Sequence, residues 1–253
     1  MRRRIIGAVA VFAAVAIAAA GCKSSDTARV QDGPAGAKPP APVTVLTQSY
    51  QKIETESFKF TSTVTIDQMT VTSDGAYDLG RKVGLANMEV AGHKIQMRIL
   101  DTDLYVEMMG RWLHVDTTNL PAGNSFAGAG NPVGNADYLL AASDDVKQVG
   151  ENTYRGTLDL HKYLDKYAKP AQKQQLEKML QRLGPQAGKV PFEATVDDQG
   201  RLTTLKTTMK IERHGRTSTV VQKMRYFDFG TKVEVEKPPA DKIQDAPAGL
   251  YHE

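Results

Sequence analysis

Short segments of alternating apolar and polar residues constrain the fold of this chain more than any other feature. In Phe58–Ile66, positions 58, 60, 64 and 66 are apolar and the residues between them are polar. Lys94–Ile99 repeats the pattern, and Leu104–Met108 continues it. Successive side chains of a strand point to opposite faces, so this period of two predicts strands with one buried and one solvated face. Strands this short and closely spaced indicate an antiparallel sheet.

Turn-forming residues divide the alternating segments. Before the helical region we expect turns at Asp74-Gly75, Gly80, Ala91-Gly92, Asp101–Asp103 and Gly110. Further strands are predicted at Tyr154–Leu160, Phe192–Val196, Leu202–Ile211, Thr217–Phe229 and Lys232–Glu236.

Two segments have the period of a helix instead. Apolar residues recur at i, i+4 and i+7 in Leu46–Ile53, and a longer helical pattern runs through His161–Leu183, with Gly184-Pro185 as its stop. Pro170 is expected to restart a helix at a first-turn position. The segment Asn119–Asn135 is rich in Gly, Asn and Pro and predicts a long loop. The order helix, about six strands, helices, then four or five strands predicts an α+β fold with an antiparallel sheet.

Cys22 is the only cysteine of the chain, and its position predicts a lipid anchor. It follows a basic start, Arg2–Arg4, and an uncharged run of small and apolar residues, Ile5–Gly21. A basic start followed by an apolar run with small residues at its end is the arrangement of an export signal. It is similar to a bacterial lipoprotein lipobox, which implies that Cys22 is acylated and becomes the mature N-terminus. A plain secretory signal, a retained membrane helix, and the choice between the general secretory and twin-arginine routes stay open.

This reading divides the chain into four parts. We expect a lipoprotein signal peptide at 1–21, an acylated cysteine with a flexible tether at 22–42, a single domain at 43–245, and a C-terminal tail at 246–253. The tether is rich in Ser, Gly, Ala and Pro and has too few large apolar residues to order itself. The domain is long enough for a substantial core without disulfide bonds.

The charge balance excludes one class of partner. The chain has 32 basic and 29 acidic residues, and removal of Arg2–Arg4 with the signal makes the two numbers equal. A nucleic-acid binder needs a concentrated basic surface, so we expect no nucleic-acid partner. Electrostatic attraction alone does not explain membrane attachment either, so the attachment depends on acyl chains at Cys22.

The search for catalytic residues gives none. The five histidines are scattered without a metal-binding pair, and no nucleophile or phosphate-binding motif occurs. Asp197-Asp198 is a carboxylate pair in a turn context, where Asp is favoured for its local hydrogen bonds. We therefore expect a non-enzymatic protein with no catalytic residues, no metal and no cofactor.

Methionines are unusually frequent in the predicted strands. Seven of the nine lie there: Met69, Met88, Met97, Met108, Met109, Met209 and Met224. Strands ordinarily favour β-branched and aromatic residues. Flexible, polarizable methionines fill gaps in a core or line adaptable apolar binding surfaces, and the sequence leaves both readings open.

Several segments together resemble the LppX/LprG-type family of actinobacterial lipoproteins, which have a LolA-like fold. The resemblance rests on the cysteine with its tether, the first helix, Ser57–Thr61, Asp103–Val106, Trp112, Val196–Leu202, Tyr226–Gly230, Val233, Val235 and Pro238. It implies a strongly curved antiparallel sheet, like an opened barrel, with helices packed on its concave side. Between the two lies an apolar pocket for acyl chains.

The resemblance therefore implies a monomeric, membrane-anchored protein outside the cytoplasm. It would bind, and transfer through the envelope, a lipid or lipoglycan, with a membrane transporter as a further partner. The cavity candidates are the inward strand positions Phe58, Phe60, Val64, Ile66, Ile95, Met97, Ile99, Leu104, Val106 and Met108. A protein-binding envelope sensor or regulatory lipoprotein is the alternative function, and a purely structural envelope protein is a third.

Overall fold

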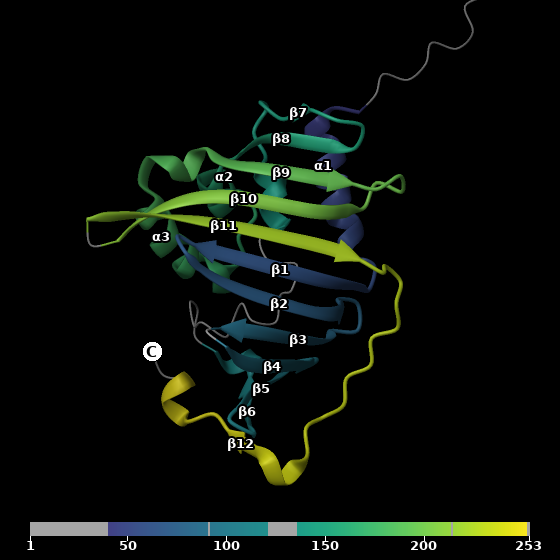
Figure 1. Ribbon diagram of the computed structural model, residues 1–253, viewed down its shortest axis with the longest axis vertical. Helices are drawn as coiled ribbons and strands as arrows, with labels where there is room; N and C mark the ends of the chain where they lie inside the picture. Colours follow the sequence, from purple (N-terminus) through teal and green to yellow (C-terminus); the bar gives the residue numbers. More distant parts are fainter. Residues whose placement is uncertain (1–39, 91, 121–135, 214, 252–253) are drawn as a thin grey trace, which may run out of the picture. The chain divides into compact units, whose positions relative to one another are not determined.

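The structure, a computed structural model, describes residues 40–90, 92–120, 136–213 and 215–251. The predicted signal peptide, Cys22, nearly all of the predicted tether and most of the predicted loop at 119–135 lie outside these residues. The described part is an α+β domain whose main feature is one large, open, curved sheet of 12 strands with few helices (Figure 1).

The elements follow the predicted order. The strands of the first half are β1 Phe58–Ile66, β2 Met69–Asp78, β3 Val83–Val90, β4 His93–Leu100, β5 Asp103–Met108 and β6 Arg111–Asp116. Those of the second half are β7 Lys147–Gln148, β8 Thr153–Leu158, β9 Val190–Val196, β10 Leu202–Arg213, β11 Arg216–Phe227 and β12 Ile243–Asp245. The helices are α1 Pro42–Ile53, α2 Leu160–Lys166 and α3 Pro170–Leu183, with short 3-10 turns η1 Thr117–Asn119, η2 Ala136–Ala141, η3 Gly184–Gly188, η4 Ala240–Lys242 and η5 Ala248–Tyr251.

The strand order joins two antiparallel meanders into one sheet. The order is β12-β6-β5-β4-β3-β2-β1-β11-β10-β9-β8-β7. β1 pairs with β2 on one side and with β11 on the other, both antiparallel. β12 pairs parallel with β6 at one edge. The first and the last long strand of the chain are therefore neighbours in the middle of the sheet.

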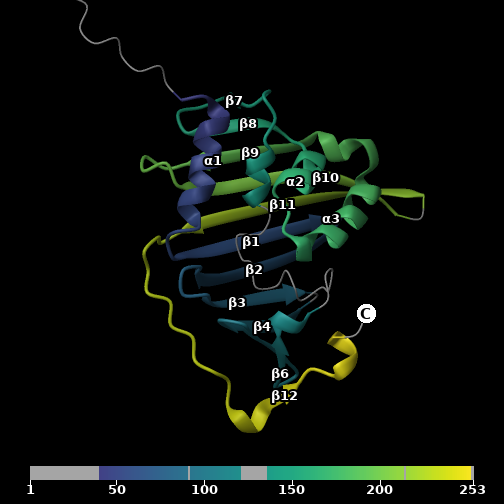
Figure 2. The ribbon, with the colours of Figure 1, turned by 180° about the vertical axis from the view of Figure 1, so that it is seen from behind.

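The pairing registers align alternate residues into rows on two faces. α1, α2 and α3 lie on one face, over the β8–β11 half of the sheet (Figure 2); α1 packs on β9 and β10, α3 on β10, and α2 on α3, η2 and η3. We call this the inner face and the opposite one the outer face. One inner row consists of Phe58, Tyr77, Gly84, Ile99 and Leu104, and all five are buried. Apolar residues of the helices and of the inner rows form a single core.

The helices form where the sequence indicates. α1 begins with Pro42 at a first-turn position and buries Leu46, Tyr50 and Ile53 against the sheet. The predicted helical segment is divided into α2 and α3, and Pro170 does restart the helix as its first residue. Gly184 ends α3 with a φ of 55°, a conformation that glycine adopts without strain.

The turn predicted at Asp74-Gly75 is wrong, because both residues lie inside β2. The ring of Phe60 lies over Gly75, and a Cβ there would lie 2.2 Å from the carbonyl oxygen of Leu85 on β3 and 2.8 Å from Phe60 Cε1. On the next strand a Cβ at Gly84 would lie 1.9 Å from Tyr77 Cδ2. These glycines therefore mark places where an aromatic ring lies across the neighbouring strand, and not breaks in the strands.

The strand predicted at Lys232–Glu236 is also wrong. The segment is irregular, and the carbonyls of Val233 and Glu236 accept hydrogen bonds from Arg81 Nη1 at 3.1 Å and Arg98 Nη1 at 2.8 Å. Arginine side chains thus satisfy carbonyls that a partner strand would satisfy in a sheet. The last strand is instead β12, after which Ala246, Leu250 and Tyr251 of the predicted tail pack against the core.

Candidate functional site

Nine of the ten predicted cavity residues have described side chains, and the registers place all nine on the inner face. Five of them are buried in the core: Phe58, Phe60, Ile99, Leu104 and Val106. Four are half-buried and pack against the core: Val64, Ile66, Ile95 and Met97. Met108 belongs to β5, but its side chain lies outside the described part. The alternation therefore identified one common face, on which burial is not uniform.

The half-buried residues gather near the β1–β2 and β3–β4 turns. We call the following set the open apolar end: Val64, Ile66, Val71, Met88, Ile95 and Met97. Val64 pairs with Val71, and Met88 with Ile95, so the set contains two cross-strand apolar pairs, while Ser73 of β2 pairs with Met88 between them. At its rim Met69 pairs with Ile66 and is 52% exposed. This half of the inner face thus presents adaptable apolar surface that the core does not fully bury.

The methionines divide between the two readings. Met209 and Met224 are buried in the core, where they fill space between the helices and the sheet. Met88 and Met97 are half-buried at the open apolar end. Met109 is fully exposed at the β5–β6 turn.

A buried polar cluster lies beneath the helices, centred on Asp137 of η2. The side chain is 8% exposed, and its Oδ2 accepts a hydrogen bond from the Tyr163 hydroxyl of α2. Oδ1 is buried and has no hydrogen-bond partner among the described residues. Burial raises the pKa of Asp137, although the bond from Tyr163 acts in the opposite direction.

Four tyrosines surround this carboxyl. Tyr138 packs edge-on against Tyr163 with ring centroids 4.7 Å apart, and Tyr50 of α1 donates to Glu54 Oε1 at 2.7 Å. Burial raises the pKa of these three phenols and of Tyr226 on β11, so all four stay protonated. Sequence reasoning missed the cluster. Its one signal is an acid, Asp137, within the otherwise apolar segment 136–142.

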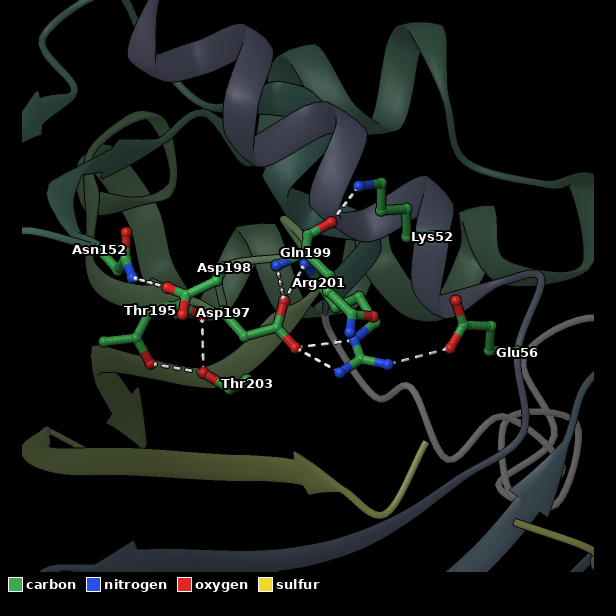
Figure 3. A network of polar contacts seen from close by, with 9 residues as sticks. All are labelled: Lys52, Glu56, Asn152, Thr195, Asp197, Asp198, Gln199, Arg201 and Thr203. Atoms are coloured by element: carbon green, nitrogen blue, oxygen red, sulfur yellow. Dashed lines mark hydrogen bonds and ion pairs between the residues drawn. The ribbon is translucent and has the colours of Figure 1, made fainter. Parts of the chain in front are cut away.

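The Asp197-Asp198 pair stabilises the β9–β10 turn through hydrogen bonds. Asp197 Oδ1 accepts from the backbone N–H groups of Gln199 at 3.0 Å and Arg201 at 2.9 Å, and Oδ2 accepts from Arg201 Nε at 2.7 Å (Figure 3). Partial burial opposes ionisation, but these bonds lower the pKa of Asp197 overall. Asp198 accepts from Asn152 Nδ2 at 3.1 Å. The pair therefore closes the β9–β10 turn and holds the β8 side of the sheet against it.

The same network holds α1 to the sheet. Lys52 Nζ donates to the carbonyl of Gln199, and Arg201 Nη1 lies 3.5 Å from Glu56 Oε2 (Figure 3). The Arg201 guanidinium also covers the ring of Phe229, 4.3 Å from its centroid. The C-terminal end of α1 is thus fixed at the sheet end opposite to the open apolar end.

The outer face carries two grooves that the sequence did not predict. A groove of about 640 Å³ lies over β2–β6 and includes Asp74, Asn87 and Gln96, and one of about 350 Å³ lies over β1 and β9–β11. Of the ten predicted cavity residues, Ile95 alone lines either of these two grooves. The only sequence signal of these grooves is the set of polar residues that alternate with the apolar ones in each strand. The grooves themselves depend on which strands pair, and a local pattern does not reveal this.

Two further observations concern membrane-spanning helices and metal-binding side chains. No helix in the described ranges is both long and apolar enough to cross a membrane. No group of three or more His, Cys, Asp or Glu side chains in the same ranges is placed to hold a metal ion.

Comparison with known proteins gives no family for this chain. No family model matches it, and no curated protein matches its sequence. Among solved structures, an uncharacterized conserved protein from Thermus thermophilus is similar, with a TM-score of 0.37, 7% identity, and coverage of 80% of this chain and 98% of that one. A DUF1329 family protein from Desulfovibrio piger has a TM-score of 0.30 and 11% identity, and the match covers 78% and 94%. Similarities of this size carry no functional argument.

Proposed function

We propose that this chain is a lipid-anchored envelope protein with a LolA-like fold that binds, and passes on, a lipid or lipoglycan through the inner face of its sheet. The observation that carries the proposal is the open apolar end. There six apolar residues of the inner face are only half-buried, and four of them, Val64, Ile66, Ile95 and Met97, pack against the core. An acyl chain that covers such a surface gains about 0.8 kcal/mol per buried methylene and needs no directional contacts.

The polar cluster at Asp137 adds a second element to the proposal. A buried carboxyl oxygen without a partner among the described residues, beside protonated phenols, can accept or donate a hydrogen bond to a polar group of a bound lipid. The acylated Cys22 would keep the domain close to the bilayer from which the lipid comes.

The test is the lipid content of the purified protein. Mass spectrometry of solvent extracts should find stoichiometric acyl-chain lipid with the wild type. The combined variant Val64→Thr, Ile66→Thr and Met97→Thr should lower lipid affinity by about tenfold or more, because three apolar contacts are lost. Val221→Thr makes the same kind of change on the outer face of β11 and should keep the lipid.

Two results would count against the proposal. One is a wild-type protein that is reproducibly empty. The other is a triple variant that folds normally and binds as much lipid as Val221→Thr. An empty protein that crosslinks to one specific envelope protein would instead support the sensor function.

A further inference from the structure

The outer face carries two rows of mainly polar residues that run across the sheet from strand to strand. The first row, in the order of the strands from β9 to β4, is Glu193, Lys206, Lys223, Thr63, Thr72, Glu89 and Lys94. The second row, from β10 to β6, is Thr204, Arg225, Thr61, Asp74, Asn87, Gln96, Glu107 and Trp112. Each residue is paired directly with the next, so the rows result from the register alone.

Both outer grooves lie on these rows and adjoin each other. The 640 Å³ groove includes Thr72, and the 350 Å³ groove includes Thr63, its direct partner across β1 and β2. Neighbouring strands are about 4.8 Å apart, so the six strands from β10 to β4 span ~24 Å. Volumes of this size are those of ligand sites, and the shared rows give them the shape of a long track.

The larger groove contains a fixed ladder of amides. Asn87 Nδ2 donates to Asp74 Oδ2 at 3.1 Å, and Gln96 Nε2 donates to Asn87 Oδ1 at 3.1 Å. Arg98 holds Gln96 Oε1 with two bonds, of 3.2 Å and 3.1 Å. Each amide therefore has a set orientation and a second N–H left for a ligand.

The charged residues around this ladder nearly balance. Glu89, Lys94 and Lys242 line the groove, and their side chains have no hydrogen-bond or ion-pair partner in the described part of the chain. Donors and acceptors thus alternate along the groove without a dominant charge. This pattern suits hydroxyl groups, because each hydroxyl both donates and accepts.

The smaller groove has a different character. Lys206 and Lys223 lie directly opposite each other on β10 and β11, and like charges in that position destabilise a sheet. Glu193, the neighbour of Lys206 on β9, is already bound by Arg155 at 2.5 Å. Neither lysine has a carboxylate partner among the described residues. An anion between the two ammonium groups would remove the repulsion.

We propose that the outer face binds a linear oligosaccharide with an anionic substituent. Its hydroxyl groups would lie on the Asn87–Gln96 ladder, and its anionic group would lie between Lys206 and Lys223. The ladder and the two lysines lie on the opposite face of the sheet from the open apolar end, although Met88 and Ile95 of that end also line the larger groove.

Calorimetric titration of the purified full-length chain tests it with four probes. These are a neutral glucose hexasaccharide, a galacturonate hexasaccharide, a galacturonate disaccharide and inorganic phosphate. The acidic hexasaccharide should bind most tightly, because it is the one probe that combines the length to reach both grooves with a negative charge. Phosphate that binds as well as the acidic hexasaccharide would overturn the proposal, as would the absence of any oligosaccharide binding at millimolar concentration.

Variants separate the two halves of the track. Asn87→Ala with Gln96→Ala should weaken both hexasaccharides about tenfold. Lys206→Gln with Lys223→Gln should remove the preference for the acidic one, and it should raise the melting temperature because it relieves repulsion. The matched control is Asn152→Ala, which removes an exposed amide with the same 3.1 Å bond to a carboxylate, outside both grooves. Equal weakening by this control would contradict the assignment.

Discussion

Asp137 is a carboxylic acid buried beneath the helices. Its carboxyl is buried, and one of its oxygens has no hydrogen-bond partner in the described residues. Because burial raises its pKa, the folded protein binds this proton more tightly than the unfolded chain does. The stability that comes from protonation is therefore present at low pH. It is lost as pH rises from about 4, the ordinary value for Asp, through the raised value in the folded state.

Asp137→Asn should remove this part of the pH dependence, because an amide does not ionise. We expect the unfolding free energy of the wild type to fall within that pH window with a slope of up to about 1.4 kcal/mol per pH unit. The variant should lack this slope. Urea unfolding at a series of pH values measures it, and Asp198→Asn at an exposed turn is the control. Equal slopes for wild type and Asp137→Asn would show that folding does not raise the pKa of this carboxyl.

Single residues also show what local sequence can and cannot reveal. The inner position of Phe60 follows from alternation, which is a property of adjacent residues. The role of Gly75 does not, because it depends on Phe60 lying over it from another strand. For the same reason the Lys206–Lys223 pairing became visible only once the register between β10 and β11 was known.

At the scale of elements, β12 depends on a side chain of the strand beside it. His114 of β6 lies 2.9 Å from Asp245 of β12 through Nδ1, and 2.7 Å from Asp103 of β5 through Nε2. Its ring stacks on Tyr105 at 5.0 Å, and Lys237 lies over the Tyr105 ring, 5.8 Å from its centroid. Burial acts against the charged form, but the two carboxylates raise the pKa of His114 overall.

The raised pKa of His114 determines the direction in which the stability of β12 changes with pH. The charged imidazolium stabilises β12 fully below the ordinary histidine pKa of about 6.5, and this contribution is lost as pH rises through the higher value in the folded state. Amide hydrogen exchange in Ile243–Asp245 should therefore accelerate in that range beyond the intrinsic pH effect. In His114→Ala it should be fast at every pH. His161→Ala, at the start of α2, should leave it unchanged, and β12 exchange without extra pH dependence would contradict the mechanism.

The elements that sequence predicted correctly are those whose pattern is local. β1, α1 and the restart of α3 at Pro170 follow from alternation, helical period and proline geometry. The failed strand at Lys232–Glu236 also alternates, but Arg81 and Arg98 bind its carbonyls from distant parts of the chain. β12 has only three residues and depends on β6 for its partner, so no pattern within the segment predicts it.

At the scale of the whole molecule, the predicted anchor is tested by replacing its attachment atom. Cys22→Ser cannot be acylated on sulfur, so the protein should move from the membrane fraction to the soluble fraction after cell breakage. Its melting temperature should not change, because the sequence places Cys22 before the domain predicted at 43–245. Ser24→Ala is the control and should stay with the membrane. Retention of Cys22→Ser in the membrane fraction would favour an uncleaved apolar segment instead.

The position of β1 between β2 and β11 has a consequence for folding. β1 to β6 pair in chain order through hairpins, so that half of the sheet can assemble before the rest of the chain is available. The other edge of β1 stays open until β11 emerges near the end of the chain. Pairings between segments so distant in sequence form slowly, and an open strand edge can pair with other chains. We therefore infer that the risk of aggregation is greatest after β1 to β6 have paired and before β11 pairs with β1, because the edge of β1 is then exposed.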